Sequence, residues 1–148
     1  MTSNGHTFLI IEDNPDDVFA LKWALKKANI LNPVQIASDG KEGLDYMSGE
    51  GIYADREEYP LPCLLFLDLK LPYVNGFEIL EWIRQQPELA SLAVVVLSGS
   101  DEARDHLRAT QLNASYYLVK PAMPSDIARI IAAIKISEWV ECDPFVAA

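Results

Sequence analysis

Hydrophobic and polar positions divide this chain into alternating blocks. Short blocks of four to six residues are almost wholly apolar, and each is followed by polar sequence. Such blocks are typical of strands that are buried on both faces, as in the middle of a parallel sheet. The predicted strands are residues 8–11, 34–37, 63–68, 92–97 and 116–119.

Between these blocks, apolar residues recur at intervals of three and four, which is typical of helices that bury one face. Five helices are predicted, with starts near residues 16, 39, 77, 103 and 124. The last helix is expected to extend to Val140. Residues 48–62 are polar, and we expect a connecting loop there that holds at most one turn of helix.

The alternation of strands and helices predicts the fold class. Parallel neighbours need crossover connections, and right-handed crossovers place helices on both faces of the sheet. We therefore expect an α/β, flavodoxin-like, doubly wound fold with five parallel strands in the order 2-1-3-4-5 and five surrounding helices. The expected domain is residues 1–141, followed by a C-terminal tail, residues 142–148, with no output domain.

Composition excludes several classes of protein. The net charge of -10 argues against nucleic acid or an anionic membrane as a partner. The sequence contains neither a secretory signal pattern nor an apolar run long enough to span a membrane, so we expect a cytoplasmic protein. Cys63 and Cys142 are too few for a disulfide framework or a zinc site, and both are interpreted as free thiols.

Polar residues stand where the predicted strands end. Glu12 and Asp13 follow the first strand, Asp68 ends the third, Ser98 follows the fourth and Lys120 follows the fifth. The carboxyl ends of parallel strands meet at one edge of the sheet, where open α/β folds bind ligands. We therefore expect these five side chains to form one cluster.

The predicted cluster favours a metal ion and phosphate chemistry. Neighbouring carboxylates repel one another by roughly 4 kcal/mol per pair at about 4 Å, so three of them need a cation. Oxygen ligands without His or Cys favour Mg²⁺. Asp68 can then act as the nucleophile towards a phosphoryl group, with Lys120 and Ser98 contacting the phosphoryl oxygens.

Each of these residues has an ordinary structural role when it is taken alone. These roles are a turn cap for Asp68, a solvated helix entry for Glu12 and Asp13, a helix cap or turn for Ser98, a surface position for Lys120 and a core position for Tyr117. Only their convergence on one sheet edge favours the functional interpretation.

The same residues resemble a known family. Asp68 is followed by Asn75-Gly76, and the fifth strand reads Tyr117-Leu118-Val119-Lys120-Pro121. With the acidic pair after the first strand and Ser98 after the fourth, this pattern resembles the receiver domain of two-component response regulators over nearly the whole chain. The resemblance implies Mg²⁺-dependent phosphoryl transfer from a sensor histidine kinase to Asp68, self-dephosphorylation, and signalling by protein contact.

The resemblance also assigns roles to individual residues. Asp13, Asp68 and the backbone carbonyl of Lys70 would ligate Mg²⁺, and Glu12 would act through water. Ser98 and Lys120 would contact the phosphoryl group, and the rotamer of Tyr117 would follow it. A cis peptide bond is expected between Lys120 and Pro121. Two positions depart from the common pattern, because Lys70 stands where many receivers carry Asn or Met, and Ser98 replaces Thr.

Two features resemble a narrower group, the single-domain receivers that serve bacterial phytochrome-type histidine kinases. They are the long 48–62 connection and the extended final helix. The last helix and the tail carry more apolar side chains than a thin final helix needs to cover the sheet, namely the stripe at residues 127–134 with Trp139 and Phe145. We therefore expect a homodimer through that helix. The same two aromatic residues can instead cover the core.

Two other functions are compatible with the residues. A haloacid-dehalogenase-like phosphatase also uses a strand-end Asp with Mg²⁺, but it needs a second Asp two residues later, where this chain has Lys70. A binding module that never accepts phosphate would signal by docking alone.

Overall fold

The computed structural model describes residues 6–133 as strands and helices that alternate along the chain. The elements are β1 (Phe8–Ile11), α1 (Pro15–Lys27), β2 (Val34–Ala37), α2 (Gly40–Ser48), a short 3-10 helix η2 (Gly51–Ala54), β3 (Leu64–Asp68), α3 (Gly76–Gln85), β4 (Ala93–Ser98), α4 (Ala103–Gln111), β5 (Tyr116–Val119) and α5 (Pro124–Ala133). The strands form one parallel sheet in the order β2-β1-β3-β4-β5, which confirms the predicted fold class and strand order.

The sheet register brings the carboxyl ends of the strands together. Ile11 pairs with Leu67, so Glu12 and Asp68 emerge side by side from β1 and β3. Ser98 pairs with Val119, and the N–H of Lys120 donates to the carbonyl of Ser98 at 2.7 Å. Every strand-end residue singled out from the sequence therefore lies at the same edge of the sheet.

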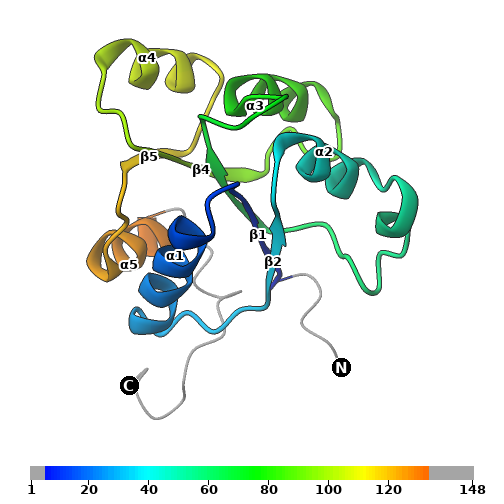
Figure 1. The fold of residues 1–148 in the computed structure, drawn as a ribbon, viewed down its shortest axis with the longest axis horizontal. Coiled ribbons are helices and arrows are strands. Elements are labelled where there is room, and N and C mark those ends of the chain that lie inside the picture. The colour runs from blue at the N-terminus through cyan, green and yellow to red at the C-terminus, as the bar shows by residue number, and fades with distance from the viewer. Residues whose placement is uncertain (1–5, 134–148) are drawn as a thin grey trace.

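Helices cover the two faces of the sheet unequally. Figure 1 shows α1 and α5 together on one face, and α2, α3 and α4 on the other. On the α1 and α5 face, Leu21 and Leu25 of α1 pack in one cluster with side chains of β1 and β3 such as Phe8 and Phe66. Alternate strand residues point to opposite faces, so this cluster uses only half of each strand.

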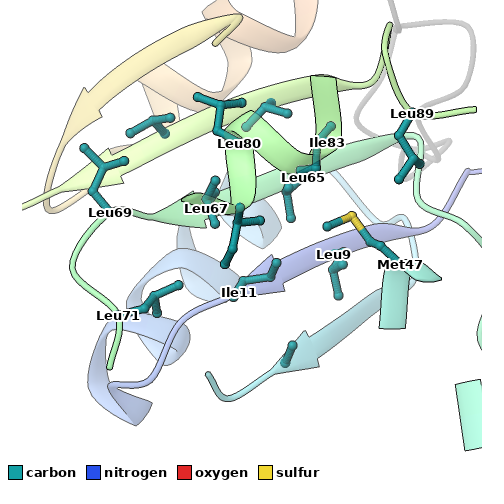
Figure 2. Close-up of a cluster of buried hydrophobic side chains, with 14 of the residues drawn as sticks. Leu9, Ile11, Met47, Leu65, Leu67, Leu69, Leu71, Leu80, Ile83 and Leu89 are labelled. Atoms are coloured by element: carbon teal, nitrogen blue, oxygen red, sulfur yellow. The ribbon is translucent and has the colours of Figure 1, made fainter. Parts of the chain in front are cut away.

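The other half of each strand builds the second core layer. Leu9, Ile11, Leu65 and Leu67 belong to this cluster (Figure 2) together with side chains of α2 and α3. All four are fully buried. Burying a Leu or Ile side chain contributes about 1.5–3 kcal/mol, so this two-sided burial holds the strands, and with them the strand ends, in fixed positions.

The final helix tests part of the predicted dimer surface. Ile127, Ile130 and Ile131 of α5 are buried in the core cluster with α1. This part of the apolar stripe therefore covers the sheet and offers no surface to a second copy. The remainder of the predicted helix, with Trp139, and the tail with Phe145 lie outside the described residues.

Helix α3 follows β3 after a connection of residues 69–75. Asn75 caps it, because its side chain accepts the N–H of Glu78 at 3.0 Å and the Glu78 carboxylate accepts the N–H of Asn75 at 3.3 Å. This reciprocal arrangement is a capping box. Gly76 follows, and a Cβ there would lie 2.7 Å from the Cα of Leu69. Only glycine lets the start of α3 approach the strand end this closely.

The 48–62 connection is a loop that contains one short turn of helix, η2, within the limit that the sequence predicted. One side chain holds this connection to α2. The guanidinium of Arg56 donates to the carbonyls of Tyr46, Met47 and Tyr59 at 2.7, 2.9 and 3.1 Å. The first two carbonyls belong to the last turn of α2, where backbone acceptors lack partners within the helix. Tyr53 packs its ring against those of Tyr46 and Tyr59.

No helix among the described residues is long and apolar enough to cross a membrane.

Candidate functional site

Three carboxylates meet at the carboxyl edge of the sheet. Glu12 and Asp13 follow β1 and Asp68 ends β3, and one oxygen from each lies within 4.8 Å of the others. Glu12 and Asp68 are buried, at 5% exposure each, whereas Asp13 is exposed. Three hard oxygen donors in this arrangement, with one side open, suit a magnesium ion, which keeps several water ligands.

Lys120 joins the carboxylates from β5. Its Nζ lies 2.6 Å from Oε1 of Glu12, 2.8 Å from Oδ2 of Asp17 and 3.5 Å from Oδ2 of Asp68. The peptide bond between Lys120 and Pro121 is cis, as the resemblance implied. The structure thus brings together the acids and the ammonium that the sequence placed at separate strand ends.

Asp17 is a site residue that the sequence reasoning missed. It lies in the first turn of α1, four residues after Asp13, and shares Lys120 with Glu12. An acid in a first helical turn is common because it interacts favourably with the helix dipole. Its position shortly after the acidic pair Glu12 and Asp13 was the only signal in the sequence.

The electrostatics of the cluster show an excess of negative charge. Burial raises the pKa of Glu12 to about 7, and the charge of Asp68 adds to this, while the hydrogen bond from Lys120 acts in the opposite direction. Burial by itself lowers the pKa of Lys120, but hydrogen bonds to Asp17 and Glu12 prevail and raise it. Glu12, Asp17 and Asp68 share one ammonium, and Asp13 adds a further negative charge beside them, so the donor set fits a divalent cation.

The site has a closed inner side and an open outer side. A small cavity of about 30 Å³ lies behind the carboxylates and is lined by Glu12, Asp17, Asp68 and Lys120 among others. The outer side opens into a shallow depression lined by residues that include Asp13 and Lys70. Asp68 lines the inner cavity, whereas Asp13 and Lys70 line the outer depression.

Lys70 contributes its backbone at the site. Its N–H donates to Oδ1 of Asp68 at 3.3 Å, which fixes one carboxylate oxygen, and its side chain is exposed. The role of its carbonyl as a metal ligand stays a prediction. Its exposed ammonium adds a positive charge beside the depression.

Ser98 and Tyr117 lie on the β4 side of the site. Ser98 is fully buried, and its hydroxyl accepts the N–H of Ser100 at 3.0 Å. The Tyr117 hydroxyl donates to the carbonyl of the same Ser100 at 2.8 Å. The two predicted switch residues are therefore bonded to opposite sides of one residue in the loop before α4.

Comparisons with known proteins agree with this geometry. The family model described as "Response regulator receiver domain" matches residues 8–133. Response regulator Rcp1 of Synechocystis sp. is 32% identical over 133 residues, which cover 90% of this chain and 88% of that protein. A solved structure of Rcp1 in its Mn²⁺-bound form is similar with a TM-score of 0.73 and covers 92% of this chain and 95% of that one.

Two further solved structures are similar. The bacteriophytochrome response regulator RtBRR has a TM-score of 0.80 at 36% identity, with 89% of this chain and 79% of that chain covered. The phosphorylated cyanobacterial phytochrome response regulator RcpA has a TM-score of 0.74 at 32% identity, with 88% and 91% covered. With its acidic cluster, strand order and these relatives, the chain belongs to the family of response regulator receiver domains of two-component systems.

Proposed function

We propose that Asp68 accepts a phosphoryl group from the phosphohistidine of a sensor histidine kinase. In this step an Asp68 carboxylate oxygen bonds to phosphorus while the bond from phosphorus to the histidine nitrogen breaks, and the imidazole leaves with the electron pair. The proposal rests on one observation: Asp68 ends a buried strand beside two other acids, with the Lys120 ammonium 3.5 Å from its carboxylate.

We assign the metal ligands to this chain's own oxygens. Asp13, Asp68 and the carbonyl of Lys70 are proposed as direct Mg²⁺ ligands, and Glu12 as a ligand through water. When bound, the ion supplies positive charge that offsets the charge on the phosphoryl oxygens. The clustered acids support this assignment, as does the Mn²⁺-bound form solved for the relative Rcp1.

The remaining site residues respond to the new charge. A phosphoryl group adds roughly -1.5 to -2 charge at pH 7, which Lys120 neutralises from the inner side. Ser98 turns its hydroxyl towards a phosphoryl oxygen, and Tyr117 follows because both residues contact Ser100.

The partner that supplies the phosphoryl group is proposed to be a phytochrome-type histidine kinase in the cytoplasm. Support comes from the relatives, which include bacteriophytochrome and cyanobacterial phytochrome response regulators. Output then passes through protein contact to a downstream partner. A homodimer through the last helix is proposed on Trp139 and Phe145 alone, because the described isoleucines of α5 are buried in the core.

Phosphorylation with a small-molecule donor tests the proposal. The protein is incubated with Mg²⁺ and acetyl phosphate, and the added mass is measured on the intact protein. The acyl phosphate is then reduced with borohydride, which releases phosphate and converts the modified aspartate to homoserine, and peptide mapping locates that homoserine. One phosphoryl group on Asp68 is expected, none in Asp68→Asn, and none after chelation of divalent ions. Asp16→Asn makes the same chemical change at an exposed position of α1 and is expected to behave as the native protein. Labelling at another residue, or none, would overturn the proposal.

The two alternatives predict different results. A haloacid-dehalogenase-like phosphatase would turn over phosphate esters, but the position two residues after Asp68 holds the exposed Lys70 in place of the general acid. A module that signals by docking alone would keep its output in Asp68→Asn.

A further inference from the structure

A histidine on α4 lies against the tyrosine of the proposed switch. The rings of His106 and Tyr117 are stacked, with centroids 3.7 Å apart and planes inclined by 24°. The imidazole Nε2 is 2.8 Å from Oδ1 of Asp101, which lies in the loop before α4. His106 therefore has two contacts at once, one through its ring face and one through its ring edge.

Tyr117 is held at both ends by this arrangement. Its hydroxyl donates to the carbonyl of Ser100 at 2.8 Å, and its ring lies under His106. The N–H of Ser100 donates to the hydroxyl of Ser98, and the N–H of Glu102 donates to the hydroxyl of Ser100 at 3.2 Å. A continuous series of contacts thus runs from Ser98 at the buried end of β4, through the loop before α4 and Tyr117, to His106 on α4.

We propose that His106 is a positioning residue for Tyr117, whose imidazole, oriented by Asp101, holds the phenol in the position where its hydroxyl bonds to Ser100. When Tyr117 leaves this position the two rings separate, and the stacking contact with α4 is lost. This inference deepens the proposed function, because it depends on Tyr117 as the residue that follows the phosphoryl group.

Histidine suits both halves of this role. Phenylalanine at this position would keep a ring to stack on Tyr117 but would have no nitrogen to contact Asp101. Glutamine would keep a polar group for Asp101 but would have no ring. The surroundings are acidic: Glu102 and Asp105 lie near Tyr117 in addition to Asp101, and Arg104 pairs with Glu102. Burial and these acids raise the pKa of Tyr117, so the phenol stays protonated and remains a donor to Ser100.

The size of the effect follows from the energy of ring stacking. Stacking of an aromatic pair contributes a free energy that corresponds to roughly a two- to tenfold change in the ratio of two rotamers. Loss of the ring should therefore move a measurable fraction of Tyr117 out of the position seen here. When a phosphoryl mimic is bound, the rotamer ratio of Tyr117 should differ between the variant and the native protein by the same factor.

Fluorine NMR of protein labelled with fluorotyrosine tests this. Tyr117→Phe assigns the signal, and spectra are recorded with Mg²⁺ alone and with Mg²⁺ and beryllofluoride. His106→Ala and His106→Gln are expected to shift or split the Tyr117 signal, with roughly a two- to tenfold change in population. His106→Phe is expected to keep it, and Asp101→Asn to show a smaller change of the same kind. Leu107→Ala alters an exposed neighbour on α4 and is expected to leave the signal as in the native protein.

The result separates the two proposals. Spectra of His106→Gln that match the native protein under both conditions would overturn the role of His106, as would a His106→Phe spectrum that matches His106→Ala. If His106→Ala fails to fold, Asp101→Asn and His106→Gln still give the answer. The spectra without beryllofluoride need no phosphorylation, so a failure of Asp68 to accept phosphate would leave the effect of His106 on Tyr117 measurable.

Discussion

Substitution of Gly76 by alanine tests how closely the start of α3 constrains Asp68. A Cβ at this position would lie 2.7 Å from the Cα of Leu69 and 3.0 Å from the carbonyl carbon of Asp68. Carbon atoms in contact are normally about 3.5–4.0 Å apart, so the chain must open by roughly 1 Å. The atoms in the way are backbone atoms of the turn that carries Asp68, and they cannot rotate aside as a side chain can.

The expected loss of stability follows from two opposing effects. Overpacking of this kind costs about 1–3 kcal/mol, and alanine regains at most about 1 kcal/mol through its better helix propensity. A net loss of about 1–2 kcal/mol corresponds to a decrease in Tm of roughly 2–8 °C for a chain of this length. Because the displaced backbone carries Asp68, phosphorylation by acetyl phosphate should slow by about tenfold or more.

Gly99→Ala is the matched control. Gly99 follows Ser98 at the same edge of the sheet, but a Cβ there meets nothing within 4 Å. Its stability should stay within about 0.5 kcal/mol of the native protein. Urea unfolding, calorimetric Mg²⁺ titration and the acetyl phosphate rate are measured for both variants. If Gly76→Ala equals Gly99→Ala in all three, the close approach does not constrain the site.

Three further predictions concern charge, ionisation and assembly. Lys120→Met removes the ammonium that three acids share, so the free energy of unfolding of the metal-free protein in urea should fall by about 2–3 kcal/mol. Mg²⁺ should then stabilise the variant more than the native chain. Equal stabilisation of the two proteins by Mg²⁺ would contradict this. Burial raises the pKa of Cys63 from its ordinary value near 9 to about 11. In a Cys142→Ser background, the rate of thiol labelling of the folded protein should therefore rise steeply until about pH 11. In urea, where Cys63 is exposed, the rate should level off near pH 9. The unfolded thiol ionises first, so this group lowers stability as pH rises from 9 to 11; coincident labelling curves would refute it. Light scattering should give a dimer for the full chain and a monomer for Trp139→Ala, and a native monomer at high micromolar concentration would end the dimer proposal.

The strands could be predicted because their sequence carries one dominant constraint. A strand buried on both faces must be apolar along its buried length, as Phe8–Ile11 and the first four residues of Leu64–Asp68 show directly. Parallel pairing then fixes which ends of the strands meet. Asp68 and Lys120 could be placed together on that basis, although 52 positions separate them in the chain.

Asp17 and Arg56 could not be predicted, because each acts through contacts that no local pattern encodes. An acid in the first turn of α1 is ordinary, and its bond to Lys120 depends on where the tertiary fold places the start of α1 relative to the residue after β5. Arg56 looks like a surface cation in a polar loop, yet it satisfies the last carbonyls of α2. The stack of His106 on Tyr117 likewise joins two elements that the sequence predicted separately.

The 48–62 connection has a consequence for how such a domain can vary. It runs from the end of α2 to the start of β3, and so reaches the sheet at the edge opposite to the carboxylates. The guanidinium of Arg56 closes it into a unit of its own. Insertions or deletions there change the surface at that end of the molecule, yet leave the carboxylate cluster in place. The surface of this connection can therefore vary independently of the site, because the two lie at opposite ends of the sheet.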